Sequence, residues 1–111
     1  MAVRKTMTPS KSMTFLILGR KHPNAPANLT ASNVTDTSVD VSWDAVTYEA
    51  GIANYEIYRD GVMVDTRVGT NLADSGLTAD TAYEYQVVAV AENGLKSELS
   101  EVLTVTTTTG A

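Results

Sequence analysis

The sequence predicts an all-β protein, a seven-stranded antiparallel sandwich of two sheets, and two observations carry this prediction. The first is a series of short segments in which apolar residues alternate with polar ones, each bounded by turn residues. The second is Tyr83, which follows Leu77 by six residues and begins a strand. That spacing is typical of a tyrosine corner, in which the tyrosine hydroxyl bonds back to the preceding turn of a β-sandwich.

The seven expected strands can be placed in chain order. They lie near residues 29–31, 37–44, 55–58, 62–64, 71–74, 83–91 and 101–106. The second strand shows the period most clearly, because Val39, Val41 and Trp43 alternate with polar residues and are expected to face the core. Between the third and fourth strands stands Asp60-Gly61, the strongest short-range signal for a hairpin. The pattern therefore favours hairpins and antiparallel pairing throughout.

Length and cysteine content limit what this fold can contain. A chain of 111 residues has room for one domain and one core. It has no cysteine, so no disulfide supports the fold and no thiolate does chemistry. The absence of cysteine does not decide the compartment, because sandwiches without disulfides also work outside cells.

Charge divides the chain into two parts. Residues 1–24 hold five basic residues and no acid, whereas residues 25–111 hold three basic residues and all 13 acidic ones. The first part carries +5 and the second −10, which together give the net charge of −5. We therefore expect a basic arm at 1–24, a sandwich domain at 25–107 and a short tail at 108–111. The acidic body should repel nucleic acid, so no nucleic-acid partner is expected.

The apolar run of the arm, Phe15 to Leu18, raises the question of a targeting segment. A secretory signal is not expected, because Arg20 and Lys21 follow where a neutral region should precede the cleavage site. The run is also too short for a membrane span, which needs roughly 20 apolar residues. No membrane partner is therefore expected.

Four segments of the sequence together resemble a fibronectin type III domain. They are Pro26–Ala31, Val39-x-Val41-x-Trp43, Tyr55-x-Ile57-Tyr58-Arg59 and Leu77-x3-Thr81-x-Tyr83-x-Tyr85-x-Val87. The resemblance covers residues 26–106. It implies sheets of strands A-B-E and C′-C-F-G, a core that contains Trp43 and the Tyr83 corner, and a non-catalytic spacer or interaction module. Integrin-binding members carry Arg-Gly-Asp in the loop before the last strand, and residues 92–97 lack it.

Nothing in the sequence indicates catalysis. The single histidine, His22, lies in the linker, where no rigid structure could hold a carboxylate and a nucleophile around it. Asp36, Asp40 and Asp44 do not have the spacing of a calcium loop, and no glycine-rich phosphate loop is present. We therefore expect a protein that is not an enzyme, with no catalytic residue, cofactor or metal.

One candidate binding surface lies on the sandwich. If Val87 and Ala89 face the core, then Val88 and Val90 face outward, and Tyr58 on the neighbouring strand shares that face. This group, Tyr58, Val88 and Val90, is a candidate contact patch. The alternative is ordinary cross-strand packing between neighbouring side chains.

The arm is the second candidate. It is too short to form a core and too apolar at residues 13–18 for a solvated tail, so it should pack on its own sandwich or dock on a partner, for example as a strand added to a sheet edge. The residues expected to bind are Arg4, Lys5, Met13, Phe15, Leu16, Ile17, Leu18, Arg20 and Lys21.

Two functional interpretations follow. In the first, the chain resembles a bacteriophage decoration or head-fibre protein, whose arm docks on a capsid or tail protein and displays the domain at the virion surface. In the second, it is a secreted spacer or carbohydrate-associated accessory module of a bacterial glycan-degrading enzyme or adhesin, and the sandwich contacts a cell-surface glycan. Recovery on a large particle, as opposed to a monomer with a protease-sensitive arm, distinguishes them.

Overall fold

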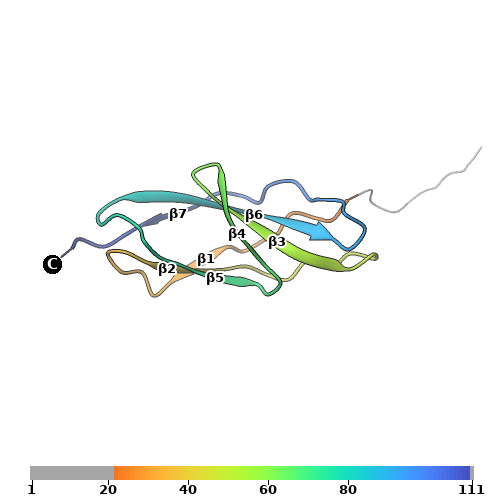
Figure 1. Ribbon diagram of the computed structural model, residues 1–111, viewed down its shortest axis with the longest axis horizontal. Helices are drawn as coiled ribbons and strands as arrows, with labels where there is room; N and C mark the ends of the chain where they lie inside the picture. Colours follow the sequence, from red (N-terminus) through yellow and green to blue (C-terminus); the bar gives the residue numbers. More distant parts are fainter. Residues whose placement is uncertain (1–21, 111) are drawn as a thin grey trace, which may run out of the picture.

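The computed structural model describes residues 22–110, and these residues form two antiparallel sheets packed face to face (Figure 1). In chain order the strands are β1 (Thr30–Ser32), β2 (Val39–Ser42), β3 (Ile52–Arg59), β4 (Val62–Arg67), β5 (Asn71–Asp74), β6 (Ala82–Ala91) and β7 (Leu103–Thr106). The prediction of an all-β, seven-stranded sandwich is confirmed. No helix in this part of the chain has the length and hydropathy to cross a membrane.

The strand order within each sheet agrees with the resemblance stated above. One sheet has the order β1-β2-β5 and the other β4-β3-β6-β7, with antiparallel pairing throughout. β1 and β7 are edge strands of different sheets, and they lie close to each other along one side of the sandwich. This side, where the two edges meet, is called the seam below.

The two ends of the described chain lie at opposite ends of the sandwich (Figure 1). The chain begins beside the end of β6, and its C-terminal end emerges beyond β7 at the far side. Thr108 is still tied to the body there, since its amide donates to the carbonyl of Thr35 and its carbonyl accepts from Asp80 at 3.0 Å each. Backbone hydrogen bonds therefore continue beyond β7 to Thr108.

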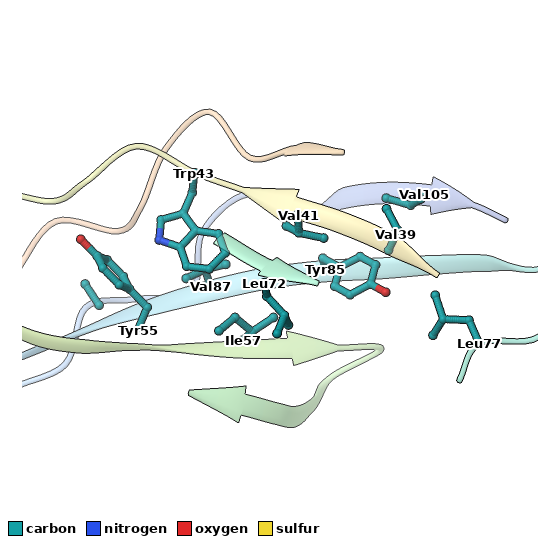
Figure 2. Packing of buried hydrophobic residues seen from close by; sticks show 11 residues of the cluster. Val39, Val41, Trp43, Tyr55, Ile57, Leu72, Leu77, Tyr85, Val87 and Val105 are labelled. Atoms are coloured by element: carbon teal, nitrogen blue, oxygen red, sulfur yellow. The ribbon is translucent and has the colours of Figure 1, made fainter. Parts of the chain in front are cut away.

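The core fills the space between the sheets and follows the alternation of the sequence (Figure 2). It consists of Val39, Val41, Trp43, Tyr55, Ile57, Leu72, Leu77, Tyr85, Val87, Ala89 and Val105. Trp43 from β2's sheet meets Tyr55 of β3 edge to face, with ring centroids 5.6 Å apart and planes at 64°. Such edge contacts add to the stabilisation that the buried area already gives.

The β3–β4 hairpin turns where the sequence predicts it. Asp60 and Gly61 have φ angles of 53° and 84°, and Arg59 pairs with Val62. Positive φ at both central positions is the geometry of a type I′ turn, which matches the twist of the two strands and favours an Asp-Gly sequence.

The tyrosine corner is also present, with one correction to its expected role. The Tyr83 hydroxyl accepts a hydrogen bond from the Thr78 amide at 2.8 Å, which ties the start of β6 to the preceding turn. Tyr83 itself is only half-buried and packs against the margin of the core. The tyrosine that fills the core is Tyr85, which is fully buried.

Replacing Tyr83 by phenylalanine should lower the free energy of unfolding by about 1 kcal/mol. The ring can stay in place, but the Thr78 amide loses its acceptor and must turn to water, which it can reach because Thr78 is exposed. Urea denaturation of both proteins measures the difference. An unchanged midpoint and slope would show that the corner bond contributes nothing to stability.

Candidate interaction surfaces

The first candidate surface is the outer face of β3 and β6, where the sequence predicts a contact patch of Tyr58, Val88 and Val90. The structure removes one of these three residues from the exposed surface. Val88 is only 5% exposed, while Tyr58 and Val90 are half-buried. Val88 lies opposite Glu56 in the ladder, and on its other side the segment from Ser97 to Ser100 runs along β6. The expectation that Val88 is part of an exposed patch is therefore wrong, because neighbours on both sides cover it.

What this face does present is an aromatic ring beside charged groups. The Tyr58 hydroxyl donates to Glu56 Oε1 at 3.1 Å, and Lys96 Nζ lies 2.9 Å from Glu56 Oε2. Partial burial and the bond to Glu56 raise the pKa of Tyr58 above its ordinary value, because both disfavour a phenolate. The hydrogen bond to Glu56 likewise raises the pKa of Lys96. This trio offers an aromatic ring, a carboxylate and an ammonium group.

A second cluster joins the two sheets near the β3–β4 turn. Asp74 of β5 accepts from the Arg59 guanidinium and from the Tyr85 hydroxyl, each at 2.6 Å. Burial and the bond to Asp74 raise the pKa of Tyr85 well above its ordinary value. Arg59 also lies over the Tyr83 ring, 5.8 Å from its centre, where a cation–π attraction adds to the contact. We call this group the Asp74 clasp. Its polar groups bond to one another, so the clasp connects the two sheets and is not a candidate ligand-binding site.

In the segment before β7, serine side chains accept hydrogen bonds from β6 amides that would otherwise bond to backbone carbonyls of a paired strand. The hydroxyls of Ser97 and Ser100 accept the amides of Ala89 and Val87 at 2.8 and 2.9 Å. Each serine amide in turn donates to the carbonyl of the same β6 residue. Because serine hydroxyls occupy positions where backbone carbonyls would stand, the regular β7 ladder begins only at Leu103 and not near residue 101.

Replacing Ser100 by alanine should destabilise the domain by about 1–3 kcal/mol, the cost of leaving the Val87 amide without an acceptor. That amide is in the buried part of β6, where water does not reach it. Thermal or urea denaturation measures the loss. Replacement of the exposed Thr104 by alanine is the matched control, and an equal effect in both would contradict the role of the hydroxyl.

A groove lies at the end of the seam, between the segments that lead into β1 and β7. It has a volume of about 440 Å³ and is lined by residues 25–29 on one side and by Leu99 and residues 101–103 on the other. Leu99 and Val102 are 50% and 49% exposed at its rim. We call it the seam groove. No periodic pattern in the sequence predicts it, because it depends on how the two segments meet in space.

The remaining candidate residues divide by position. All nine residues of the arm that were expected to bind a partner fall within 1–21, outside the described residues, and stay predictions. His22 is exposed, and its Nδ1 lies 3.0 Å from the Pro23 carbonyl. Within residues 22–110 no group of three histidine, cysteine, aspartate or glutamate side chains could hold a metal ion.

The architecture defines the class of protein. Two sheets of three and four strands in this order, with a tyrosine corner at the start of β6, make an immunoglobulin-like β-sandwich module. Residues 24–106 match the model of the fibronectin type III domain, and the chain belongs to that family.

Several curated relatives share this module. Chitinase C of Streptomyces lividans is 47% identical over 92 residues, which is 83% of this chain and 15% of that protein. Chitinase 63 of Streptomyces plicatus is 46% identical over 92 residues, again 83% and 15%. Exoglucanase B of Cellulomonas fimi is 42% identical over 85 residues, 77% of this chain and 8% of the enzyme. The chain thus spans a small part of each of these relatives.

Solved structures confirm the fold. A fibronectin type III domain of a human protein superposes with a TM-score of 0.72 at 20% identity, covering 85% of this chain and 93% of that one. A family 28 exopolygalacturonase of Yersinia enterocolitica gives a TM-score of 0.72 at 19% identity, over 78% of this chain and 21% of the other. At these identities the likeness shows the fold alone.

The relatives bear on the two interpretations drawn from the sequence. Those described above are chitinases and an exoglucanase by name, and an alpha-amylase of Niallia circulans matches at 46% identity as well. They favour the second interpretation, a module associated with glycan-degrading enzymes. The interpretation as a virion decoration protein receives no support from them.

Proposed function

We propose that this domain is a non-catalytic spacer and accessory module that works outside the cell alongside a bacterial polysaccharide-degrading enzyme. The observation that carries the proposal is the pattern of the relatives. The same module, at 42–47% identity, occupies 7–17% of enzymes named for different reactions. A part that is shared while the named reaction changes is not the part that performs the reaction.

The geometry of the domain suits a spacer. Its two ends lie at opposite ends of the sandwich, so units joined to them are held apart by the length of the strands (Figure 1). The longest strand, β6, has ten residues, which corresponds to about 33 Å at ~3.3 Å per residue. The packed core makes this distance fixed, unlike that of a flexible linker of equal length.

A module exchange tests the proposal. The 92 matched residues of chitinase C are replaced by this domain, and the chimera is compared with the parent and with a variant from which the module is deleted. We expect all three to cleave a soluble chitin oligomer equally, and the chimera to exceed the deletion variant on insoluble chitin. Release of sugar by this domain alone, or a chimera no better than the deletion, would overturn the proposal.

A second role rests on Tyr58 with Glu56 and Lys96. An aromatic ring flanked by a carboxylate and an ammonium group combines an apolar face with hydrogen-bonding groups, the mixture that orients a polar ligand on an apolar surface. We propose that this face contacts the glycan. Depletion of the protein by insoluble chitin or cellulose measures the contact.

Tyr58→Ala should reduce the bound fraction, whereas Val62→Ala should not. Val62 is a suitable control because it is 65% exposed and pairs with Arg59. The Arg59 side chain bonds to Asp74 of the other sheet, so this pair lies on the opposite face from Tyr58. Equal depletion of both variants and the parent would exclude this face as the contact. That result would leave the spacer proposal standing, since the module exchange tests it separately.

A further inference from the structure

The outer edge of β4 is an uncovered sheet edge. β4 lies at one side of the four-stranded sheet, and among residues 22–110 it pairs only with β3. Such an edge presents backbone groups that can pair with a strand of another chain. Three large apolar side chains on this strand or just after it are exposed, namely Val62 at 65%, Met63 at 49% and Val68 at 82%. The β4 edge is therefore a candidate surface for strand addition.

The hydrogen bonds of β6 show which backbone groups of β4 are directed outward. The Val87 amide bonds to Ser100, on the side of β6 that faces away from β3. Since successive residues direct their backbone groups to opposite sides of a strand, Val88 directs its groups toward its β3 partner Glu56, and Glu56 directs its groups toward β6. Thr66, which lies opposite Glu56 on β4, therefore directs its amide and carbonyl to the free side of the edge.

One side chain of β4 already bonds to this outward amide. The Thr66 amide donates to Asp65 Oδ1 at 2.8 Å, which agrees with an amide that faces no neighbouring strand. The other oxygen of Asp65 lies 3.9 Å from the Arg67 guanidinium, and both charged side chains are nearly half exposed. An ion pair with this distance and exposure contributes little to stability. The two charges are thus free to form a closer pair with a second strand.

Two antiparallel copies of β4 have one register that satisfies both the backbone and the charges. With Thr66 opposite Thr66, each threonine amide donates to the carbonyl of the other, which takes the place of the Asp65 carboxylate. The pairs on either side are those in which side chains lie closest, and they bring Asp65 opposite Arg67 of the second copy twice. A register centred on Asp65 or on Arg67 would instead bring like charges together.

The same register also covers apolar surface, although the total contact is small. It places Val68, which is 82% exposed, opposite Val64 of the second copy. The irregular pairing of β4 with β3 lies between residues 63 and 65, so the charged pairs extend from the regular end of the strand. A contact of this length buries less than the ~1,200 Å² at which stable complexes begin, so the association is weak and reversible.

We propose that the β4 edge binds a second copy of this domain, through antiparallel pairing of the two β4 strands about Thr66. The two four-stranded sheets then form one continuous sheet related by a two-fold axis. The outer faces that carry Tyr58 point to the same side of that sheet. The inference concerns the edge of the domain and does not depend on the function proposed above.

A single cysteine on the two-fold axis tests the pairing, because the chain has no cysteine of its own. Thr66→Cys brings two thiols opposite each other at a Cα separation of about 5.5 Å, within the range of a disulfide. Thr104→Cys is the matched control, since Thr104 is an exposed threonine on β7, the other edge of the same sheet. Under mild oxidation at equal concentration, we expect Thr66→Cys to form disulfide-linked dimers on the order of tenfold faster. Equal rates for the two variants would overturn the proposal.

Charge exchange in the Thr66→Cys protein tests the register. Asp65→Arg places like charges opposite each other and should reduce the rate of dimer formation to that of the Thr104→Cys control. Adding Arg67→Asp restores two opposite-charge pairs and should restore the rate. Asp65→Arg also makes the acidic chain less negative by two charges, which would accelerate random encounters, so slower dimer formation is specific to the pairing. A single variant that is no slower, or a double variant that stays slow, would overturn this register.

The unmodified protein provides a measurement without cysteines. NMR spectra recorded at increasing protein concentration should show the backbone amide signals of Thr66, Arg67 and Val68 shifting progressively. The signals of β7 should remain in place, because that edge takes no part in the contact. Shifts at β7 in place of β4, or no shifts at either edge, would overturn the proposal.

Discussion

Replacing Trp43 by alanine is expected to lower the free energy of unfolding by about 3–5 kcal/mol. Its side chain is 5% exposed and lies between the sheets against Tyr55 (Figure 2), so truncation leaves a cavity lined by residues that cannot all move inward. The indole N–H has no partner among the described residues, so the loss is one of packing and not of a hydrogen bond. A domain of this size has only ~5–15 kcal/mol of stability in total.

Urea denaturation followed by circular dichroism measures this change, since the variant lacks the only tryptophan as a fluorophore. Trp43→Phe is the control, because it retains an aromatic ring and should lose clearly less stability. A loss below ~1 kcal/mol for the alanine variant would contradict the place of Trp43 at the centre of the core.

Replacing Asp74 by alanine should cost on the order of 3 kcal/mol. The change removes the acceptor of the buried Tyr85 hydroxyl and the partner of Arg59, both bonded at 2.6 Å. The Asp74 side chain is 12% exposed and that of Arg59 28%, so water can replace the lost bond for the arginine but not for the tyrosine.

The exposed pair of Arg67 and Asp65 is the matched control for the clasp. Their charged atoms are 3.9 Å apart and both side chains are nearly half exposed, so Asp65→Ala should change stability by less than ~1 kcal/mol. The Tyr85→Phe variant removes only the bond between the tyrosine hydroxyl and Asp74 and keeps the pair of Arg59 and Asp74, so it separates the contributions of the two bonds to stability. If Asp74→Ala has no larger effect than Asp65→Ala, the clasp does not stabilise the contact between the sheets.

The fold could be predicted because its signals are local. Alternation at Val39, Val41 and Trp43 defines a strand with one buried face, and the Asp60-Gly61 dipeptide by itself favours a type I′ turn. The burial of Val88 could not be predicted in this way. Period two assigns it to the outer face, but its burial depends on β3 and the segment at 97–100, which lie on either side of β6.

The clasp and the seam groove were missed for the same physical reason. Arg59 and Asp74 are 15 residues apart on different sheets, and only the packing of the sheets brings them together. Ser97 and Ser100 are three residues apart, a spacing that suits no regular strand. Their role as acceptors for β6 amides is visible only once β6 lies beside them. Both features depend on contacts between elements, which a local pattern does not encode.

The first functional interpretation depends on the basic arm, the part of the chain with the most unusual composition. The contrast of +5 against −10 directed the first interpretation to the arm and to a virion partner. The relatives instead match residues that overlap the sandwich, whose side chains are mostly engaged in packing and carry no chemical motif. A module without a catalytic or binding motif is recognised by its whole pattern of core and turn residues. Its role is inferred from the proteins that contain it.

The placement of the two ends at opposite poles determines how the domain responds to force. Tension applied through those ends runs nearly parallel to the strands (Figure 1). It loads the three-residue pairing of β1 with β2 and the four-residue pairing of β7 with β6 in shear, so the hydrogen bonds of each ladder must break together and cannot open one at a time. A domain pulled from its two ends would therefore keep its length until a whole ladder fails.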